Sequence, residues 1–379
     1  MNFFIKMSKI ICFVTLSLIF SNKAFSEISF SGYQEFFMGS ADQSQMLGLA
    51  TSDQTDQSKS GLSNGTYTRL IATGSTKLDS GLEVTGVYTI DKDSDNGGDD
   101  NNDGVSVAEN SLTIAGGFGA VAVGNMNSVG SMMHYRADTL IPTAEPDGAN
   151  YKHFFTAGSN SYGPVNELDY ARDSMKIRFM SNVYEGFSVG ASYASSVTGE
   201  GDTASGTDQN TGTATDYSDI TDLVIKYAGE MEGVGYGFTY GYTTGNTQII
   251  SGAKYNDYEG TMLTGELSYA GFVVQVKSIE QGDSGGLVTT TDDGDEEGFT
   301  ACAIYGMGNF TVGYCDQHTE LKETAVSVKN EMDVKVASIG YDLGGGVNIS
   351  AAYFSHEESQ GTTSDTDADG VFTMLSFGF

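Results

Sequence analysis

The chain has 379 residues, of which 50 are acidic and 18 are basic, so its formal net charge is -32. This charge repels phosphate backbones, and no Lys/Arg stripe is present to neutralise them, which excludes nucleic-acid binding. The 50 glycines, 21 Tyr and 21 Phe, with only 3 Pro and no Trp, disfavour a helical enzyme, because glycine costs roughly 1 kcal/mol per helix position relative to alanine. Composition therefore predicts an all-β protein.

Residues 1–26 have the pattern of a secretory signal peptide. Two lysines precede an apolar run at residues 10–20, and small side chains stand at Ala24 and Ser26. The run is about half of the roughly 20 residues that a membrane-spanning helix needs, and no later candidate follows. We expect cleavage to leave residues 27–379 as a single exported domain without a transmembrane helix.

The remaining chain consists of short segments in which apolar and polar side chains alternate. Leu82 and Val84, for example, share one parity, while Glu83 and Thr85 share the other. The same division recurs in the segments 187–194 and 347–353. A period of two predicts strands with one apolar face and one mostly polar face.

The joints between these segments alternate between short and long. Short joints rich in Gly and Asn, residues that tolerate positive φ, are predicted as hairpin turns at 79–81, 117–119, 184–186, 230–233, 270–271, 308–309 and 344–345. Long polar joints are predicted at 40–61, 92–106, 127–170, 199–217, 246–257, 282–298, 320–331 and 358–368. Seven short and eight long joints connect sixteen strands.

The prolines favour a closed sheet. Pro142, Pro146 and Pro164 all fall in the segment 127–170. A continuous hydrogen-bonded sheet without edges requires strands free of proline, whereas a soluble β-sandwich carries prolines at its edges and turns. A closed antiparallel barrel is therefore favoured over a sandwich.

The features of the chain together resemble the general bacterial porin family, the sixteen-stranded trimeric diffusion channels of Gram-negative outer membranes. An exported β-chain with an apolar face fits a barrel in an outer membrane. The resemblance rests on the order of turns and loops and on the segments 28–33, 116–119 and 186–190 and the terminal Phe379. It implies a transmembrane barrel with short periplasmic turns, long external loops, an inward-folded third loop, a homotrimer, and contact with outer-membrane lipid and lipopolysaccharide.

In that family the third long loop narrows the barrel, and its acids face basic side chains on the wall. The matching loop here, residues 127–170, carries His134 and His153 together with the candidate constriction residues Arg136, Asp138, Glu145, Asp147, Glu167 and Asp169. It has no Pro-Glu-Phe-Gly element of the family type. Opposed charges across a narrow pore sort solutes by charge and dipole.

Basic residues on the polar parity of the strands are the candidates for the opposing wall. They are Arg69, Lys77, Arg172, Lys176 and Arg178. Parity predicts that these side chains point into the lumen. The alternative is that they pair with loop acids or simply meet water.

Two acidic runs resemble calcium-binding loops, because hard oxygen ligands at alternate positions before a glycine suit Ca2+. They are Asp91, Asp93 and Asp95, and Asp365, Asp367 and Asp369. Ser376 occupies the position of the bidentate glutamate of an EF-hand after Asp365, so a complete EF-hand is excluded there. The alternative is that both runs are solvated external loops, and no cofactor is required.

Two cysteines, Cys302 and Cys315, flank the turn at 308–309 symmetrically. If Met307 pairs with Phe310, the two cysteines lie opposite each other on the lumen face, and a cross-strand disulfide is geometrically plausible. Two reduced thiols, or a register slip of one residue, are the alternatives.

The sequence predicts a channel rather than an enzyme, because the four histidines, His134, His153, His318 and His356, stand in no spacing typical of a nucleophilic site. We expect passive diffusion of small hydrophilic solutes, with weak cation selectivity from the acidic mouths. A substrate-specific channel and a non-porous adhesin are the alternatives. A sugar channel would need an aromatic stripe inside the pore, and most Tyr and Phe fall instead on the apolar parity.

Overall fold

The computed structural model describes residues 27–45, 61–93, 106–143, 151–155, 168, 174–196, 217–247, 249–250, 253–254, 256–282, 284, 296–323, 328–360 and 364–379. The expected signal peptide lies outside these residues.

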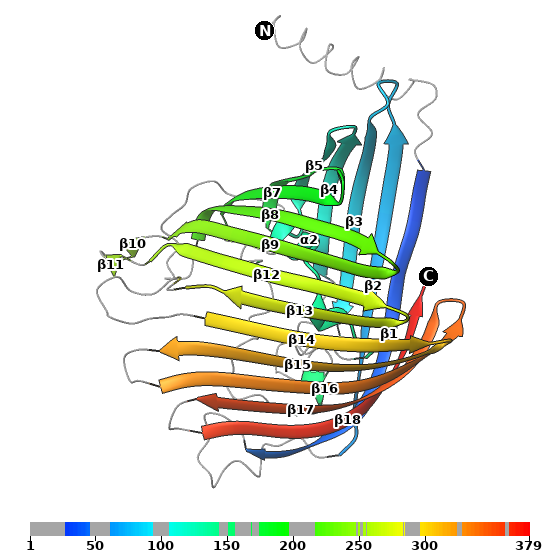
Figure 1. The fold of residues 1–379 in the computed structure, drawn as a ribbon, viewed down its shortest axis with the longest axis vertical. Helices are drawn as coiled ribbons and strands as arrows, with labels where there is room; N and C mark the ends of the chain where they lie inside the picture. The colour runs from blue at the N-terminus through cyan, green and yellow to red at the C-terminus, as the bar shows by residue number, and fades with distance from the viewer. Residues whose placement is uncertain are drawn as a thin grey trace, which may run out of the picture.

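Sixteen strands form a closed antiparallel barrel in which each strand pairs with its neighbour in the chain and β18 pairs with β1 (Figure 1). The strands of the barrel are β1 (Glu27–Gln45), β2 (Ser63–Lys77), β3 (Glu83–Asp93), β4 (Ser106–Gly116), β5 (Gly119–Asn125), β6 (Met175–Met180), β7 (Phe187–Ser196), β8 (Tyr217–Met231), β9 (Val234–Thr247), β12 (Tyr258–Tyr269), β13 (Phe272–Glu280), β14 (Glu296–Met307), β15 (Phe310–Glu323), β16 (Val328–Gly344), β17 (Val347–Gln360) and β18 (Ser364–Gly378). A separate two-stranded sheet pairs β10 (Ile249–Ile250) with β11 (Ala253–Lys254). The predicted fold class is confirmed.

The alternating parity of the sequence separates the two faces of the barrel. Large apolar side chains such as Leu70, Leu263 and Leu375 are 37%, 48% and 47% exposed and point outward. Towards the short-turn end, outward aromatic rings pair across neighbouring strands, with centroid distances of 4.6 Å for Phe187–Tyr227, 4.2 Å for Phe272–Tyr305 and 4.5 Å for Phe310–Tyr341. An apolar band with an aromatic girdle is the surface that a membrane-spanning barrel presents to lipid.

The short joints are hairpin turns, as predicted. Figure 1 shows those between β8 and β9, β12 and β13, and β14 and β15 at the end of the barrel where the chain terminates. Four of the turns place consecutive residues at positive φ, namely Glu185–Gly186, Glu232–Gly233, Ala270–Gly271 and Gly344–Gly346. Two consecutive positive φ values match the right-handed twist of the flanking strands, which is why these turns close hairpins.

Two of the predicted long loops are wrong. The segments 320–331 and 358–368 are mostly strand, because β15 continues to Glu323, β16 begins at Val328, β17 continues to Gln360 and β18 begins at Ser364. Polar composition indicated loops there. Beyond the apolar band, however, a strand meets water on its outer face, so polar residues are compatible with continued pairing.

The connection between β5 and β6, residues 126–174, folds into the barrel and is called here the inner loop. Its described part contains α2 (Val129–Met133), η2 (Ala137–Thr139) and η3 (Tyr151–Phe154). Residues of α2 lie against β6, β7, β8 and β9, those of η2 against β13 and β14, and those of η3 against β1, β2 and β18. The inner loop therefore crosses the lumen, as the predicted third loop does. None of the helices in the described ranges is long and apolar enough to cross a membrane.

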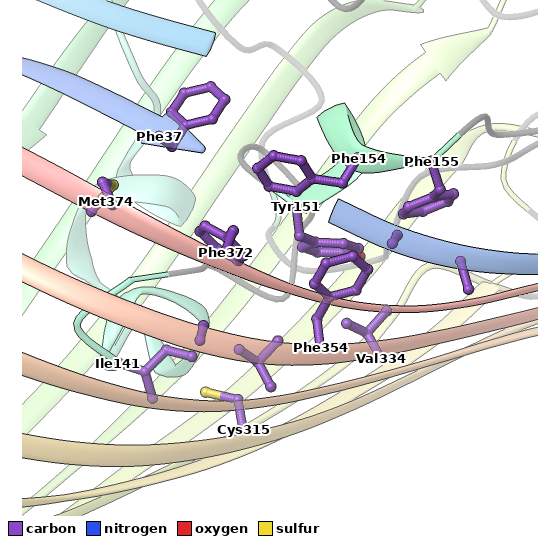
Figure 2. Packing of buried hydrophobic residues seen from close by; sticks show 14 of the residues in the cluster. Phe37, Ile141, Tyr151, Phe154, Phe155, Cys315, Val334, Phe354, Phe372 and Met374 are labelled. Carbon is purple, nitrogen blue, oxygen red and sulfur yellow. The ribbon is translucent and has the colours of Figure 1, made fainter. Parts of the chain in front are cut away.

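An apolar core lies inside the barrel, between the inner loop and one side of the wall. Figure 2 shows Tyr151, Phe154 and Phe155 of the loop against Phe354 and Phe372 of the strands. The cluster has further members on β1, on β14 to β18 and on the loop: Phe37, Ala41, Ala137, Ile141, Cys302, Cys315, Met332, Val334, Val336, Ala352, Ala368 and Met374.

The expectation of a mostly polar inner face is thus wrong for parts of β16 to β18 and for β1 from Phe37 onward. Apolar side chains face inward there because they pack against the inner loop rather than water. The open part of the lumen is bounded by the other side of the wall and by the start of β1, where Tyr33 and Glu35 are half-buried.

Candidate functional site

The start of the inner loop is fixed to the wall by two basic side chains. Lys176 donates a hydrogen bond to the carbonyl oxygen of Met126, and Arg178 donates one of 2.7 Å to that of Asn127. Both point inward, as parity predicts, but they are only 4% and 7% exposed. They position the loop instead of lining open water, because the loop covers them.

A buried carboxylate supports the same region. Asp222 is 1% exposed and accepts hydrogen bonds from Ser192 (2.6 Å) and Thr243 (2.7 Å). The Ser192 hydroxyl in turn accepts a bond of 3.2 Å from the backbone N–H of Val129, the first residue of α2. Buried polar groups with satisfied partners hold a segment in one arrangement, so this network ties α2 to β7, β8 and β9.

Glycines on the wall make room for side chains of the inner loop. A Cβ atom added at Gly237 of β9 would overlap the phenol of Tyr135. Added Cβ atoms would lie 2.6 Å from Ile141 at Gly313 and 2.7 Å from Pro142 at Gly340. These glycines allow the loop to lie close to the strands.

Tyr135 also brings together two charged wall residues that were not among the candidates from the sequence. The ammonium group of Lys226 lies 4.0 Å from the centroid of the Tyr135 ring, a cation–π contact. Burial, and to a smaller extent the neighbouring charge of Glu266, raises the pKa of Tyr135, so its phenol stays neutral. Glu266 accepts a hydrogen bond of 2.6 Å from Gln275. Lys226 and Glu266 were detectable from their inward parity.

The open side of the wall carries a compact group of polar and aromatic side chains on β1, β2 and β3. Arg69 forms two hydrogen bonds with Asp91, from Nε at 2.7 Å and from a terminal nitrogen at 2.6 Å, and is 35% exposed. Tyr67 donates a bond of 2.9 Å to the same carboxylate. The ring centroids of Tyr33 and Tyr67 lie 5.6 Å apart, with the Arg69 guanidinium 5.9 and 5.8 Å from them.

This arrangement corrects two expectations. Tyr33 and Tyr67 form an aromatic pair on the lumen face, where no aromatic stripe was located from the sequence. Asp91, one candidate calcium ligand, instead binds Arg69 and Tyr67 with its carboxylate. The side chain of Asp93 and the whole of Asp95 lie outside the described residues.

The second candidate calcium run is not in a loop. Asp365, Asp367 and Asp369 belong to β18, where Asp369 accepts a hydrogen bond of 2.6 Å from Tyr353 on the outer face. Within the described part of the chain, no three His, Cys, Asp or Glu side chains are grouped as metal ligands.

The remaining candidates are distributed as follows. Arg136 is exposed, and Lys77 is exposed at the short-turn end of β2, away from the inner loop. His134 contacts the Gly130 carbonyl at 2.7 Å, and His153 packs 4.7 Å from the Phe37 ring. Outside the described residues lie Glu145, Asp147, Glu167, Asp169, Arg172 and the side chain of Asp138.

Cys302 and Cys315 are directly opposite in the register of β14 and β15, and a disulfide joins them. Both are buried on the lumen face, and the Cys315 sulfur lies 3.7 Å from the carbonyl oxygen of Ala137 in η2. The bond is therefore part of the wall on which the inner loop rests.

Fold and lumen define a membrane-spanning β-barrel with an internal loop that narrows its passage. The family model for Gram-negative porins matches residues 14–368. The chain belongs to this family, and it is an outer-membrane porin channel. No curated protein matches the sequence.

Solved porin structures share the fold at low sequence identity. The anion-selective porin from Comamonas acidovorans superposes with a TM-score of 0.63 at 13% identity, covering 93% of this chain and 100% of that one. In vitro folded OmpT from Vibrio cholerae, in its trimer form, gives 0.59 at 11%, covering 93% and 99%. A mutant of Rh. blastica porin gives 0.55 at 13%, covering 93% and 100%.

Proposed function

We propose that the channel conducts small hydrophilic solutes passively and prefers cations weakly. The observation that carries this proposal is that inward cations are more often buried or paired than inward carboxylates. Lys176, Arg178 and Lys277 are at most 7% exposed, and Arg69 is paired with Asp91. The half-buried Lys226 lies against the ring of Tyr135 and near the charge of Glu266. Buried or paired cations contribute little potential to the water of the lumen.

Inward carboxylates also remain half-buried without an ion pair among the described residues, among them Glu35, Glu109 and Glu266. Glu109 and Glu266 accept hydrogen bonds from Ser111 (2.7 Å) and Gln275 (2.6 Å), which are neutral donors and leave the charges in place. Together with the net charge of -32, these groups raise the local concentration of cations.

The proposed mechanism has no chemical step. The inner loop sets the size limit, and the half-buried charges of the open wall set the charge preference. By analogy with the trimer form of OmpT, we propose a homotrimer whose outer band contacts membrane lipid, including lipopolysaccharide.

The test is the reversal potential of refolded protein in a planar bilayer under a KCl gradient. The native channel is expected to show a potential of the sign for K+ preference, and the double variant Glu109→Gln/Glu266→Gln is expected to move it towards zero. Asp369→Asn with Glu357→Gln is the matched control, because both acids lie on the outer face. A native channel that prefers chloride would contradict the selectivity, and a folded barrel without conductance would favour a non-porous adhesin.

A further inference from the structure

Together with Glu35, the group on β1, β2 and β3 contains one cation, Arg69, and two carboxylates. Arg69 and Asp91 neutralise each other through two hydrogen bonds of 2.7 and 2.6 Å. The Glu35 side chain, on the same inward parity of β1, makes no hydrogen bond or ion pair with a residue that the structure describes. The group therefore carries one uncompensated negative charge.

This carboxylate lies beside two aromatic rings. In the register of β1 and β2, Glu35 is directly opposite Tyr67, and Tyr33 is opposite Arg69. Directly paired residues have their Cβ atoms about 4.5–5.5 Å apart, so the acid and the rings border the same space. Glu35, Tyr33 and Tyr67 are each half-buried, so they are reached from the lumen.

The position of the group places it on the path of a solute. Tyr33 pairs with Gly378 of β18, near the short-turn end, whereas Phe37, four residues further along β1, contacts His153 and Phe154 of the inner loop. Glu35 lies between these two levels. A solute that passes the inner loop along the open wall meets Glu35 and the rings next.

An aromatic pair beside an unpaired carboxylate is the chemistry that recognises an organic cation. Ring faces attract a cation and provide apolar contact for its carbon substituents, and the carboxylate supplies the opposite charge. The group already holds one such cation, since the Arg69 guanidinium lies within 6 Å of both rings. A small inorganic ion makes no use of the apolar ring surface.

We propose that Glu35, Tyr33 and Tyr67 form a binding site for small organic monocations, amines or quaternary ammonium ions, on the lumen wall. Arg69 and Asp91 position the rings. The proposal rests on the proposed function, because it names a class of solute for a cation-preferring channel. It concerns binding at one place on the wall and predicts saturation, which bulk charge preference does not.

The experiment measures potassium current through single channels in symmetric KCl while choline chloride is added to both sides. Choline is expected to reduce the current with saturation, and an equal concentration of NaCl is not. Glu35→Gln is expected to raise the half-blocking choline concentration about fivefold, and Tyr67→Leu by a similar factor. Tyr33→Phe keeps the ring, so choline is expected to block this variant at the same concentration as the native channel.

Glu109→Gln is the matched control. It removes an inward carboxylate of the same wall that lies outside the group of Glu35, Tyr33 and Tyr67. It is expected to reduce the preference for K+ over Cl- and to leave the half-blocking choline concentration unchanged. Equal weakening of block by Glu35→Gln and Glu109→Gln would overturn the site in favour of general charge. A native current that responds equally to choline and Na+ would overturn it as well.

The reversal potential in a KCl gradient, recorded on the same membranes, separates the two proposals. A channel with K+ preference and no saturable choline block retains the proposed function and loses the site. A channel without K+ preference loses the proposed function. Heat-dependent migration of each variant in an electrophoretic gel verifies that the barrel has folded.

Discussion

Arg178 of β6 donates a hydrogen bond of 2.7 Å to the carbonyl oxygen of Asn127 and so holds the first residues of the inner loop against the wall. A side chain that parity assigns to the pore wall therefore positions the loop that narrows the pore. Its charge is buried, and one terminal nitrogen of the guanidinium donates to a backbone carbonyl oxygen, a suitable acceptor for this group.

Replacement of this anchor is expected to loosen the loop. Arg178→Leu removes a charge-assisted hydrogen bond, so open-channel current noise should increase and mean conductance should rise. Lys77→Gln removes the same charge at the exposed end of β2 and should leave the noise unchanged. Identical noise in both variants would show that the loop is held by its apolar core alone.

The contact between Gly237 and Tyr135 gives a second prediction. Gly237→Ala forces the Tyr135 ring out of its place and should lower the free energy of unfolding by about 1–3 kcal/mol, with altered conductance. Adding Tyr135→Ala removes the clashing ring and should bring the conductance back towards the native value. Gly86→Ala is the control, since the nearest atom to its added Cβ is 3.9 Å away. Additive effects of the two substitutions in a double-mutant cycle would contradict the contact.

The disulfide between Cys302 and Cys315 is expected to protect both thiols from alkylation in the native protein, as measured by mass spectrometry without reductant. The double variant Cys302→Ser/Cys315→Ser should lose about 2 kcal/mol of stability in denaturant unfolding, because a short closed loop constrains the unfolded chain. Each single variant should show one alkylatable thiol. Two alkylated cysteines in the unreduced native protein would refute the bond.

The pairing of Arg69 with Asp91 predicts a change in ion preference. Arg69→Gln leaves the Asp91 carboxylate without its cation, so the reversal potential in a KCl gradient should shift further towards K+. Arg69→Lys keeps a positive charge and should stay close to the native value, although it loses the two-bond geometry. A shift of Arg69→Gln towards chloride would mean that Asp91 does not control the lumen potential.

The barrel was predictable from the sequence because its signals are local. Alternation at Leu82 to Thr85 indicates a strand with two unlike faces, and turns such as Gly344–Gly345 mark hairpins by residues that accept positive φ. The register that places Cys302 opposite Cys315 follows from the turn between them. Polar strand ends, such as that of β15, were mistaken for loops because local composition does not show where the membrane ends.

The site was less predictable, because it depends on contacts across the lumen. Parity alone put Lys176, Arg178 and Arg69 on the inner face, but it did not show that their surroundings differ. Lys176 and Arg178 are covered by the loop, whereas Arg69 meets Asp91 on the next strand. Tyr33 and Tyr67 are close only because β1 and β2 pair in one particular register.

The sequence by itself determined the strands, their order, the turns and which side chains face inward, since each follows from a period of two and from turn residues along the chain. The tertiary structure decided which inward residues meet water. The path of the inner loop across the barrel settles that question by covering the apolar side of β16 to β18 and β1. Burial by a segment far away in the sequence leaves no local pattern in the strands that it covers.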